Sequence, residues 1–136
     1  MGISVALPAE SSWTDITAQL HDAPLTYAKV DGVGALQFSS GLYQSGPIPR
    51  ASTSVLREML AEFAQLNHLG VASDTVHEDG SLSLSAGSFR IDAFFRVWYL
   101  SDGSSFALAT YTCALENEAK GEVTECEQIV RSVRFG

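Results

Sequence analysis

Two apolar segments of alternating pattern, separated by an Asp-Gly pair, constrain the fold of this chain more than any other feature. They form the stretch FFRVWYLSDGSSFALATYTC, residues 94–113. Alternating segments around Asp-Gly are a strong signal for an antiparallel hairpin. Centring the turn on Asp102-Gly103 predicts three pairs on one face: Tyr99 with Phe106, Val97 with Leu108, and Phe95 with Thr110. We expect this face to pack against the first helix in the core.

The opposite face of this hairpin also carries large side chains. They are Phe94, Arg96, Trp98 and Tyr111. Alanines predicted opposite Arg96 and Trp98 would leave a shallow depression between them. If the C-terminal helix packs on this face, these side chains belong to the core. If it does not, they are anchors for a binding partner. Coverage by the helix is the favoured alternative.

The remaining strands are predicted from turn signals. Asp31-Gly32 predicts a hairpin with the following pairs: Leu25 with Phe38, Ala28 with Ala35, and Val30 with Val33. Asp79-Gly80 and Ala86-Gly87 predict two further turns. The second of these turns implies a long strand over residues 89–100, with a bend or a bulge near Ala93.

Two segments have the periodicity of amphipathic helices. In residues 52–70 the apolar positions recur at steps of three and four, at Leu56, Met59, Leu60, Phe63 and Leu66. In residues 121–135 they recur at Val123, Cys126, Ile129, Val130 and Val133. Each segment therefore presents one apolar stripe to a core and one polar face to solvent.

The order of elements is hairpin, helix, antiparallel meander and C-terminal helix. A chain of 136 residues fits one domain. We therefore predict a single α+β domain over residues 1–136, built on an antiparallel β-sheet meander with helices packed on both faces.

The string GALQFSSG, followed by a proline-containing loop and an amphipathic helix, resembles the PsbP-like fold family. So does FFRVWYLSDGSSFALATYTC followed by EQIVRSVRF. The resemblance covers most of the chain from about Leu25 and implies an α/β/α sandwich. It implies binding rather than catalysis, and it brings no catalytic residues to carry over. Small bacterial members of this fold include immunity-type proteins and chaperones linked to type VI secretion.

Charge and motifs narrow the class of function. The net charge of −8 disfavours nucleic acids and anionic lipid, and it favours a basic partner. An acidic surface that serves solubility alone is the other interpretation. The cysteines and histidines are scattered, so we expect no metal site and no cofactor. No nucleophile, zinc or phosphate-binding motif is present, so we expect a protein that is not an enzyme.

Two binding hypotheses follow, with different sites. In the first, an immunity-type protein places Glu116, Glu118, Glu122 and Glu125 in the basic cleft of a toxin or effector. In the second, a chaperone or adaptor holds an effector's apolar segment on the aromatic face of the hairpin. An accessory subunit of a larger assembly is a further alternative.

Three further expectations concern cysteines, location and assembly. Cys113 and Cys126 either form a disulfide or remain as two buried thiols. The N-terminal residues MGISVALPAE contain no early Lys or Arg, so we expect a cytoplasmic protein, or a periplasmic one if a signal peptide was removed. No segment is apolar enough to span a membrane. A monomer and a homodimer both remain open, because a long edge strand could pair with a second copy.

Overall fold

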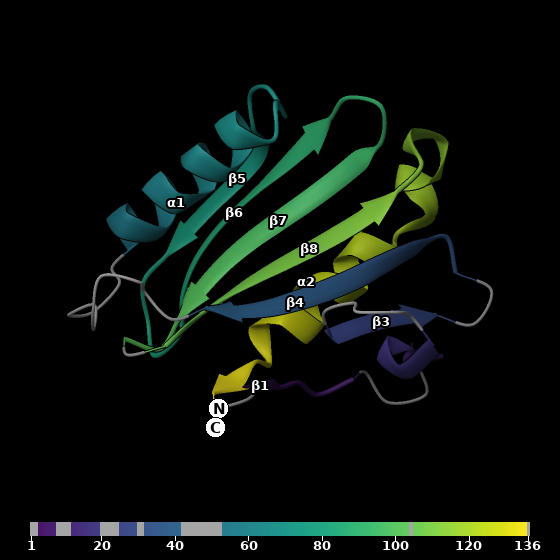
Figure 1. The fold of residues 1–136 in the computed structure, drawn as a ribbon, viewed down its shortest axis with the longest axis horizontal. Coiled ribbons are helices and arrows are strands. Elements are labelled where there is room, and N and C mark those ends of the chain that lie inside the picture. Colours follow the sequence, from purple (N-terminus) through teal and green to yellow (C-terminus); the bar gives the residue numbers. More distant parts are fainter. Residues whose placement is uncertain are drawn as a thin grey trace.

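A computed structural model of the chain describes residues 3–7, 12–19, 25–29, 32–41, 53–103 and 105–135 (Figure 1). These residues form a mixed α+β structure with a seven-stranded antiparallel sheet and two α-helices. The strands of this sheet are β2 (Trp13–Asp15), β3 (Leu25–Lys29), β4 (Gly34–Gly41), β5 (Ser73–Glu78), β6 (Ser83–Arg90), β7 (Phe94–Ser101) and β8 (Phe106–Cys113). The helices are α1 (Thr53–Leu66), α2 (Glu122–Arg131), and the short 3-10 helices η1 (Thr17–Gln19) and η2 (Leu115–Lys120).

The strand order in the sheet is β2-β3-β4-β8-β7-β6-β5. A separate antiparallel pair joins β1 (Ile3–Ser4) to β9 (Arg134–Phe135), so the two ends of the described chain lie side by side (Figure 1). The chain crosses from β4 to the far edge strand β5 by way of α1. No helix in the described part of the chain has the length and apolarity needed to cross a membrane.

The predicted register of the first hairpin is confirmed. Leu25 pairs with Phe38 and Ala28 pairs with Ala35 across β3 and β4. The predicted pair of Val30 with Val33 lies outside the described residues, because Val30 and Asp31 are not among them.

The predicted register of the β7–β8 hairpin is wrong by two residues. Val97 pairs with Thr110 instead of Leu108. The reason is a longer turn: the Asp102 amide donates to the Ser105 carbonyl at 3.2 Å, and the Ser105 amide donates to Asp102 Oδ1 at 2.8 Å. A shift of two residues keeps each side chain on its predicted face, because side chains alternate with a period of two.

The predicted turn at Ala86-Gly87 is also wrong. Strand β6 continues through both residues, and Gly87 pairs with Val97. The chain turns later, where the Ile91 amide donates to the Ala93 carbonyl at 3.2 Å. The expected long strand over residues 89–100 is therefore the end of β6, a turn, and β7.

Buried side chains form two clusters. One contains Phe94, Trp98 and Tyr111 together with residues of α2, which are Cys126, Ile129 and Val130. The other contains Phe89, Val97 and Tyr99 together with residues of α1, which are Leu56, Leu60 and Ala64. Neighbouring residues of β7 thus belong alternately to the two clusters, as the pleat of a strand requires.

The cysteines do not form the disulfide that was one of the two alternatives. Cys113 and Cys126 are free thiols, and both are buried in the cluster that contains α2. Burial raises the pKa of both thiols, and nearby glutamates raise the pKa of Cys126 further. These thiols therefore act as small apolar core residues.

Candidate functional site

A pocket of about 450 Å³ lies between α1 and the strands β5 and β6. We call it the α1–β5 pocket. Its apolar lining includes Leu60, Ala61, Ala64, Ala72 and Phe89. Its polar lining is Arg57, Gln65, His68, Thr75 and His77. Ligand sites are usually concave surfaces of roughly 300–1,000 Å³ with mostly apolar walls and a few polar groups, and this pocket meets that description.

Helix α1 supplies one wall of the pocket through its periodicity. Arg57, Ala61, Ala64 and Gln65 are spaced by four, three and one residues and all line the pocket. Residues at such spacings share one side of an α-helix. The helix is held at its start by Asp79, whose carboxylate accepts hydrogen bonds from the Thr53 amide and hydroxyl at 3.2 and 2.9 Å.

Gly87 allows residues that line the pocket to pack closely against β6. A Cβ atom at this position would lie 3.0 Å from the Ala72 Cβ and 3.5 Å from the Leu60 Cδ2. It would also lie 3.6 Å from the Thr75 Cγ2. A glycine inside a strand often marks such a close approach, and here the contacts of its absent side chain would be with pocket residues.

A bulge in β5 positions the strand wall of the pocket. Ser73 pairs with Ser88 of β6, and Val76 pairs with Ala86. Two residues of β5 therefore lie between pairs that only one residue separates in β6, so β5 carries one extra residue. Asp74 lies in this bulge and has a left-handed backbone conformation, with φ of 51°. Bulges commonly redirect a side chain next to functional sites, and Thr75 of this bulge lines the pocket.

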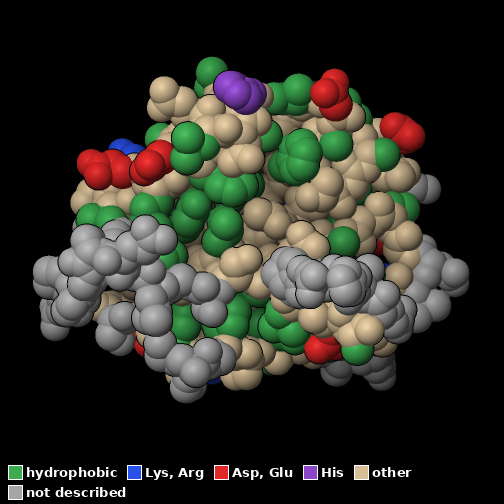
Figure 2. Space-filling view, in the orientation of Figure 1, with side chains coloured by type: hydrophobic (Ala, Val, Ile, Leu, Met, Phe, Trp, Pro, Cys, Tyr) green, Lys and Arg blue, Asp and Glu red, His purple; other side chains and the backbone are tan. Residues whose placement is uncertain are grey.

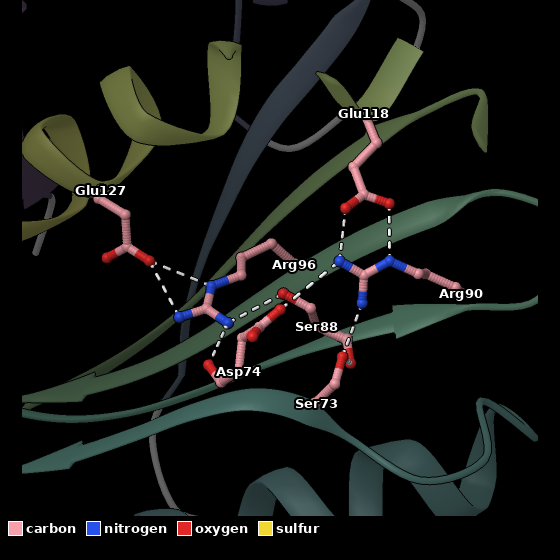
Figure 3. Close-up of polar contacts among 7 residues, drawn as sticks. All are labelled: Ser73, Asp74, Ser88, Arg90, Arg96, Glu118 and Glu127. Carbon is pink, nitrogen blue, oxygen red and sulfur yellow. Dashed lines mark hydrogen bonds and ion pairs between the residues drawn. The ribbon is translucent and has the colours of Figure 1, made fainter. Parts of the chain in front are cut away.

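Arg96 holds the bulge from the other side of the sheet (Figure 3). Its guanidinium donates to the Asp74 carbonyl at 2.6 Å, to Ser88 Oγ at 2.9 Å and to Glu127 at 3.1 Å. The residue is only 5% exposed. Arg96 therefore joins β5, β6 and α2, and its predicted role as a surface contact for a partner is corrected to a structural one.

The other predicted anchors of the aromatic face are buried as well. Phe94, Trp98 and Tyr111 are each 2% exposed or less. They lie in the cluster that contains α2, so no partner reaches them in this structure. Burial raises the pKa of the Tyr111 hydroxyl, which donates a hydrogen bond to Glu122 at 3.0 Å. The prediction that these side chains bind a partner is thus corrected, because the C-terminal helix packs on them.

Three of the four predicted acidic contacts have partners within the chain. Glu118 pairs with Arg90 (Figure 3), and this pairing lowers the pKa of the Glu118 carboxyl. Glu125 accepts from Lys29 Nζ at 2.8 Å and from Trp13 Nε1 at 2.6 Å. The hydrogen bond from Lys29 is the main reason that the pKa of Glu125 is lowered.

Glu122 differs from these surface pairs because it is buried, with 7% exposure. Its carboxylate accepts hydrogen bonds from the Tyr111 hydroxyl at 3.0 Å and from the Val33 amide at 2.9 Å. Only Glu116, among the four predicted residues, is exposed and has no such contact within the described residues. The predicted acidic surface is therefore mostly a set of internal contacts.

His77 is part of the wall of the pocket that β5 forms. Its Nδ1 lies 2.8 Å from Ser85 Oγ, and Ser85 is fully buried. Partial burial lowers the pKa of His77, and the positive charge of Arg57 lowers it further. The lowered pKa favours the neutral imidazole. Because Ser85 is inaccessible, this His–Ser pair is not a nucleophile for a substrate in the pocket.

His68 ends α1 in an unusual way. Its amide donates to the Gln65 carbonyl at 3.3 Å, and the Leu69 amide donates to the Ala64 carbonyl at 2.9 Å. These bonds define a Schellman motif, in which the position of His68 is usually glycine because it requires a left-handed backbone. His68 has φ of 54° and lines the pocket. Backbone strain of this kind is concentrated at ligand-binding and active sites in proteins.

Arg57 carries an uncompensated positive charge. Among the residues that the structure describes, this guanidinium has no ion pair and no hydrogen bond. By contrast, Lys29, Arg90, Arg96 and Arg131 each pair with a glutamate. The α1–β5 pocket thus has a free cation at its edge, although the protein as a whole has a net charge of −8.

Reasoning from sequence alone did not find this site. The spacing of Arg57, Gln65 and His68 in and just after one helix was a usable signal, but the turn wrongly placed at Ala86-Gly87 divided β6, which lies beside the pocket residues of β5 and supplies Phe89. No protein-family model matches the chain, and no curated protein sequence matches it.

Proposed function

We propose that this protein is a non-catalytic binding protein that holds an apolar segment of a protein partner in the α1–β5 pocket. The observation that carries the proposal is the pocket itself, about 450 Å³ with an apolar lining and free polar groups at its edge. Two exposed apolar residues directly follow residues that line the pocket: Leu66, which is 71% exposed, follows Gln65, and Val71, which is 94% exposed, follows Gly70. Holding an apolar segment is the work of a chaperone or an adaptor.

The non-catalytic part of the proposal is supported by the state of the reactive groups. Ser85, the hydroxyl next to His77, is fully buried. Asp79 is engaged at the start of α1. Both thiols are buried, and the pKa of each is raised, which weakens a thiol as a nucleophile.

A pocket-filling substitution tests the binding site. Ala61 is exposed and lines the pocket, so Ala61→Trp would occupy the space without disturbing the core. The probe is an end-blocked peptide with a central Phe flanked by Asn, titrated against the labelled full chain while amide NMR shifts are recorded. We expect shifts in residues 60–64 and 72–77, and at least a tenfold loss of affinity in Ala61→Trp. Gln128→Trp, on the exposed side of α2, is the matched control. Equal binding by both variants would refute the proposal.

We further infer that α1 and α2 cover opposite faces of the sheet, as in the α/β/α sandwich of the PsbP-like fold. The two separate clusters support this inference, because Trp98 packs with α2 whereas Val97 and Tyr99 pack with α1. The free thiols favour a reducing compartment, and we propose a cytoplasmic location. We also propose a monomer, because Asp74, Glu78 and the bulge in β5 oppose pairing at this edge.

An immunity-type function against a basic toxin is the second candidate. The net charge of −8 and the exposure of Glu116 favour it. However, on the face that Figure 2 shows, the acidic side chains form separate groups, most of them near its margins, and not one patch. Binding to a basic toxin would weaken strongly as salt is raised, and Glu116→Lys would weaken it further. Affinity that is indifferent to both changes would exclude this candidate.

A further inference from the structure

The free charge at the α1–β5 pocket is opposite in sign to the charge of the molecule. Arg57 lines the pocket and has no ion pair within the described residues. Of the five arginines that the structure describes, Arg90, Arg96 and Arg131 pair with a glutamate, whereas Arg57 and Arg134 do not, and of these two only Arg57 lines the pocket. Arginine is well suited to bind a carboxylate, because its N–H groups can donate two parallel hydrogen bonds.

Two further groups at the edge of the pocket are free to bind. Neither the Gln65 amide nor the His68 ring has a hydrogen-bond partner in the part of the chain that the structure describes. The Gln65 amide supplies N–H donors on the same side of α1 as Arg57, about two helical turns further along. The floor between them is apolar, with Leu60 and Ala64 from α1 and Phe89 from β6. The pocket therefore combines an apolar interior with hydrogen-bond donors at its edge.

We propose that the segment bound in the α1–β5 pocket is acidic: a large apolar side chain enters the pocket, and an Asp or Glu beside it pairs with Arg57. This inference rests on the proposed function and adds the charge of the partner segment. It reverses the expectation of a basic partner that the overall composition favours. Local charge complementarity decides the partner here, because at physiological salt exposed charges beyond about 8 Å are largely screened.

Three end-blocked peptides test this inference on the full chain. Each has a central Phe, which is flanked by Asp in the first, by Asn in the second and by Lys in the third. Dissociation constants are measured by NMR titration. We expect the Asp peptide to bind about fivefold more tightly than the Asn peptide, as one partly exposed ion pair allows. We expect the Lys peptide to bind most weakly.

Two variants assign the preference to one residue. Arg57→Gln should abolish the advantage of the Asp peptide over the Asn peptide, measured as the ratio of the two dissociation constants in the same variant. Arg134→Gln removes the same charge from an exposed position in β9 and should preserve the advantage. Equal binding of the Asp and Asn peptides by the unaltered protein would overturn the inference but leave the proposed function intact. A loss of the advantage in Arg134→Gln would overturn it too. If none of the peptides shifts pocket residues, the inference and the proposed function both fail.

Discussion

Replacing His68 by glycine should stabilise the protein, although it removes a side chain. A non-glycine residue in the left-handed region costs roughly 1–2 kcal/mol, and His68 has φ of 54° in the C-terminal cap of α1. Glycine avoids this strain but costs about 0.5–1 kcal/mol through the entropy of the unfolded chain. The net gain therefore lies in the range of about 0–1.5 kcal/mol, with a middle value of about 0.75 kcal/mol. With about 2.1 cal/mol/K of unfolding entropy per residue, a chain of 136 residues gains about 2–3 °C in Tm.

The matched control for this prediction is His68→Ala. It removes the same imidazole but keeps a Cβ atom, so it retains the strain and should not raise Tm. Both variants are compared with the unaltered protein by scanning calorimetry and by urea unfolding. If His68→Gly is no more stable than His68→Ala, the account of the helix cap is refuted. If the ring is retained for binding, both variants should bind the Asp peptide more weakly than the unaltered protein does.

Three further predictions concern packing and ion pairs in the rest of the fold. Arg96→Met should lower the free energy of unfolding by about 2–4 kcal/mol in urea, because it leaves buried acceptors unpaired; a loss below about 1 kcal/mol would contradict the role of the Arg96 network. Gly34→Ala should cost about 1–3 kcal/mol or more, since its Cβ would lie 2.5 Å from the Thr112 carbonyl and 2.6 Å from the Tyr111 hydroxyl. Gly80→Ala, whose nearest neighbour would be at 3.7 Å, should be almost neutral, and equal effects would count against the packing argument. Ion pairing lowers the carboxyl pKa of Glu118 and Glu125 from the ordinary 4.5, so the unfolded state takes up protons first on acidification. The stability that these pairs contribute is thus present above about pH 4.5 and is lost as pH falls through the folded pKa. Tm measured from pH 7 to 3 should fall less in Glu125→Gln than in the unaltered protein, and an equal fall would show that this pair does not stabilise the fold.

The elements of the fold could be predicted from the sequence where local signals were sufficient. The register of β3 and β4 followed from one Asp-Gly pair, whereas the β7–β8 register was wrong by two residues because Asp102 and Ser105 close a longer turn. Gly87 was misread as a turn residue because glycine in a turn and glycine at a close approach look alike in sequence. The close approach of Ala72 to Gly87 shows that this glycine belongs to a strand and not to a turn, but that approach arises only from tertiary packing.

The candidate site was harder to predict, because pairing of charges is a property of the folded chain. Glu125 pairs with Lys29, which lies 96 residues away in the sequence, and Glu118 pairs with Arg90, which lies 28 residues away. No local pattern indicates that these acids are neutralised or that Arg57 is not. Net charge therefore predicted the sign of the molecular surface, but not the charge at the pocket.

The most direct test of the central claim, that the α1–β5 pocket is the binding site, is a map of intermolecular NOEs from the Phe ring of the Asn-flanked peptide. The account predicts NOEs to the methyl groups of Leu60, Ala64, Ala72 and Thr75, all of which line the pocket. NOEs confined instead to exposed apolar residues elsewhere, such as Leu7 or Leu115, would contradict it.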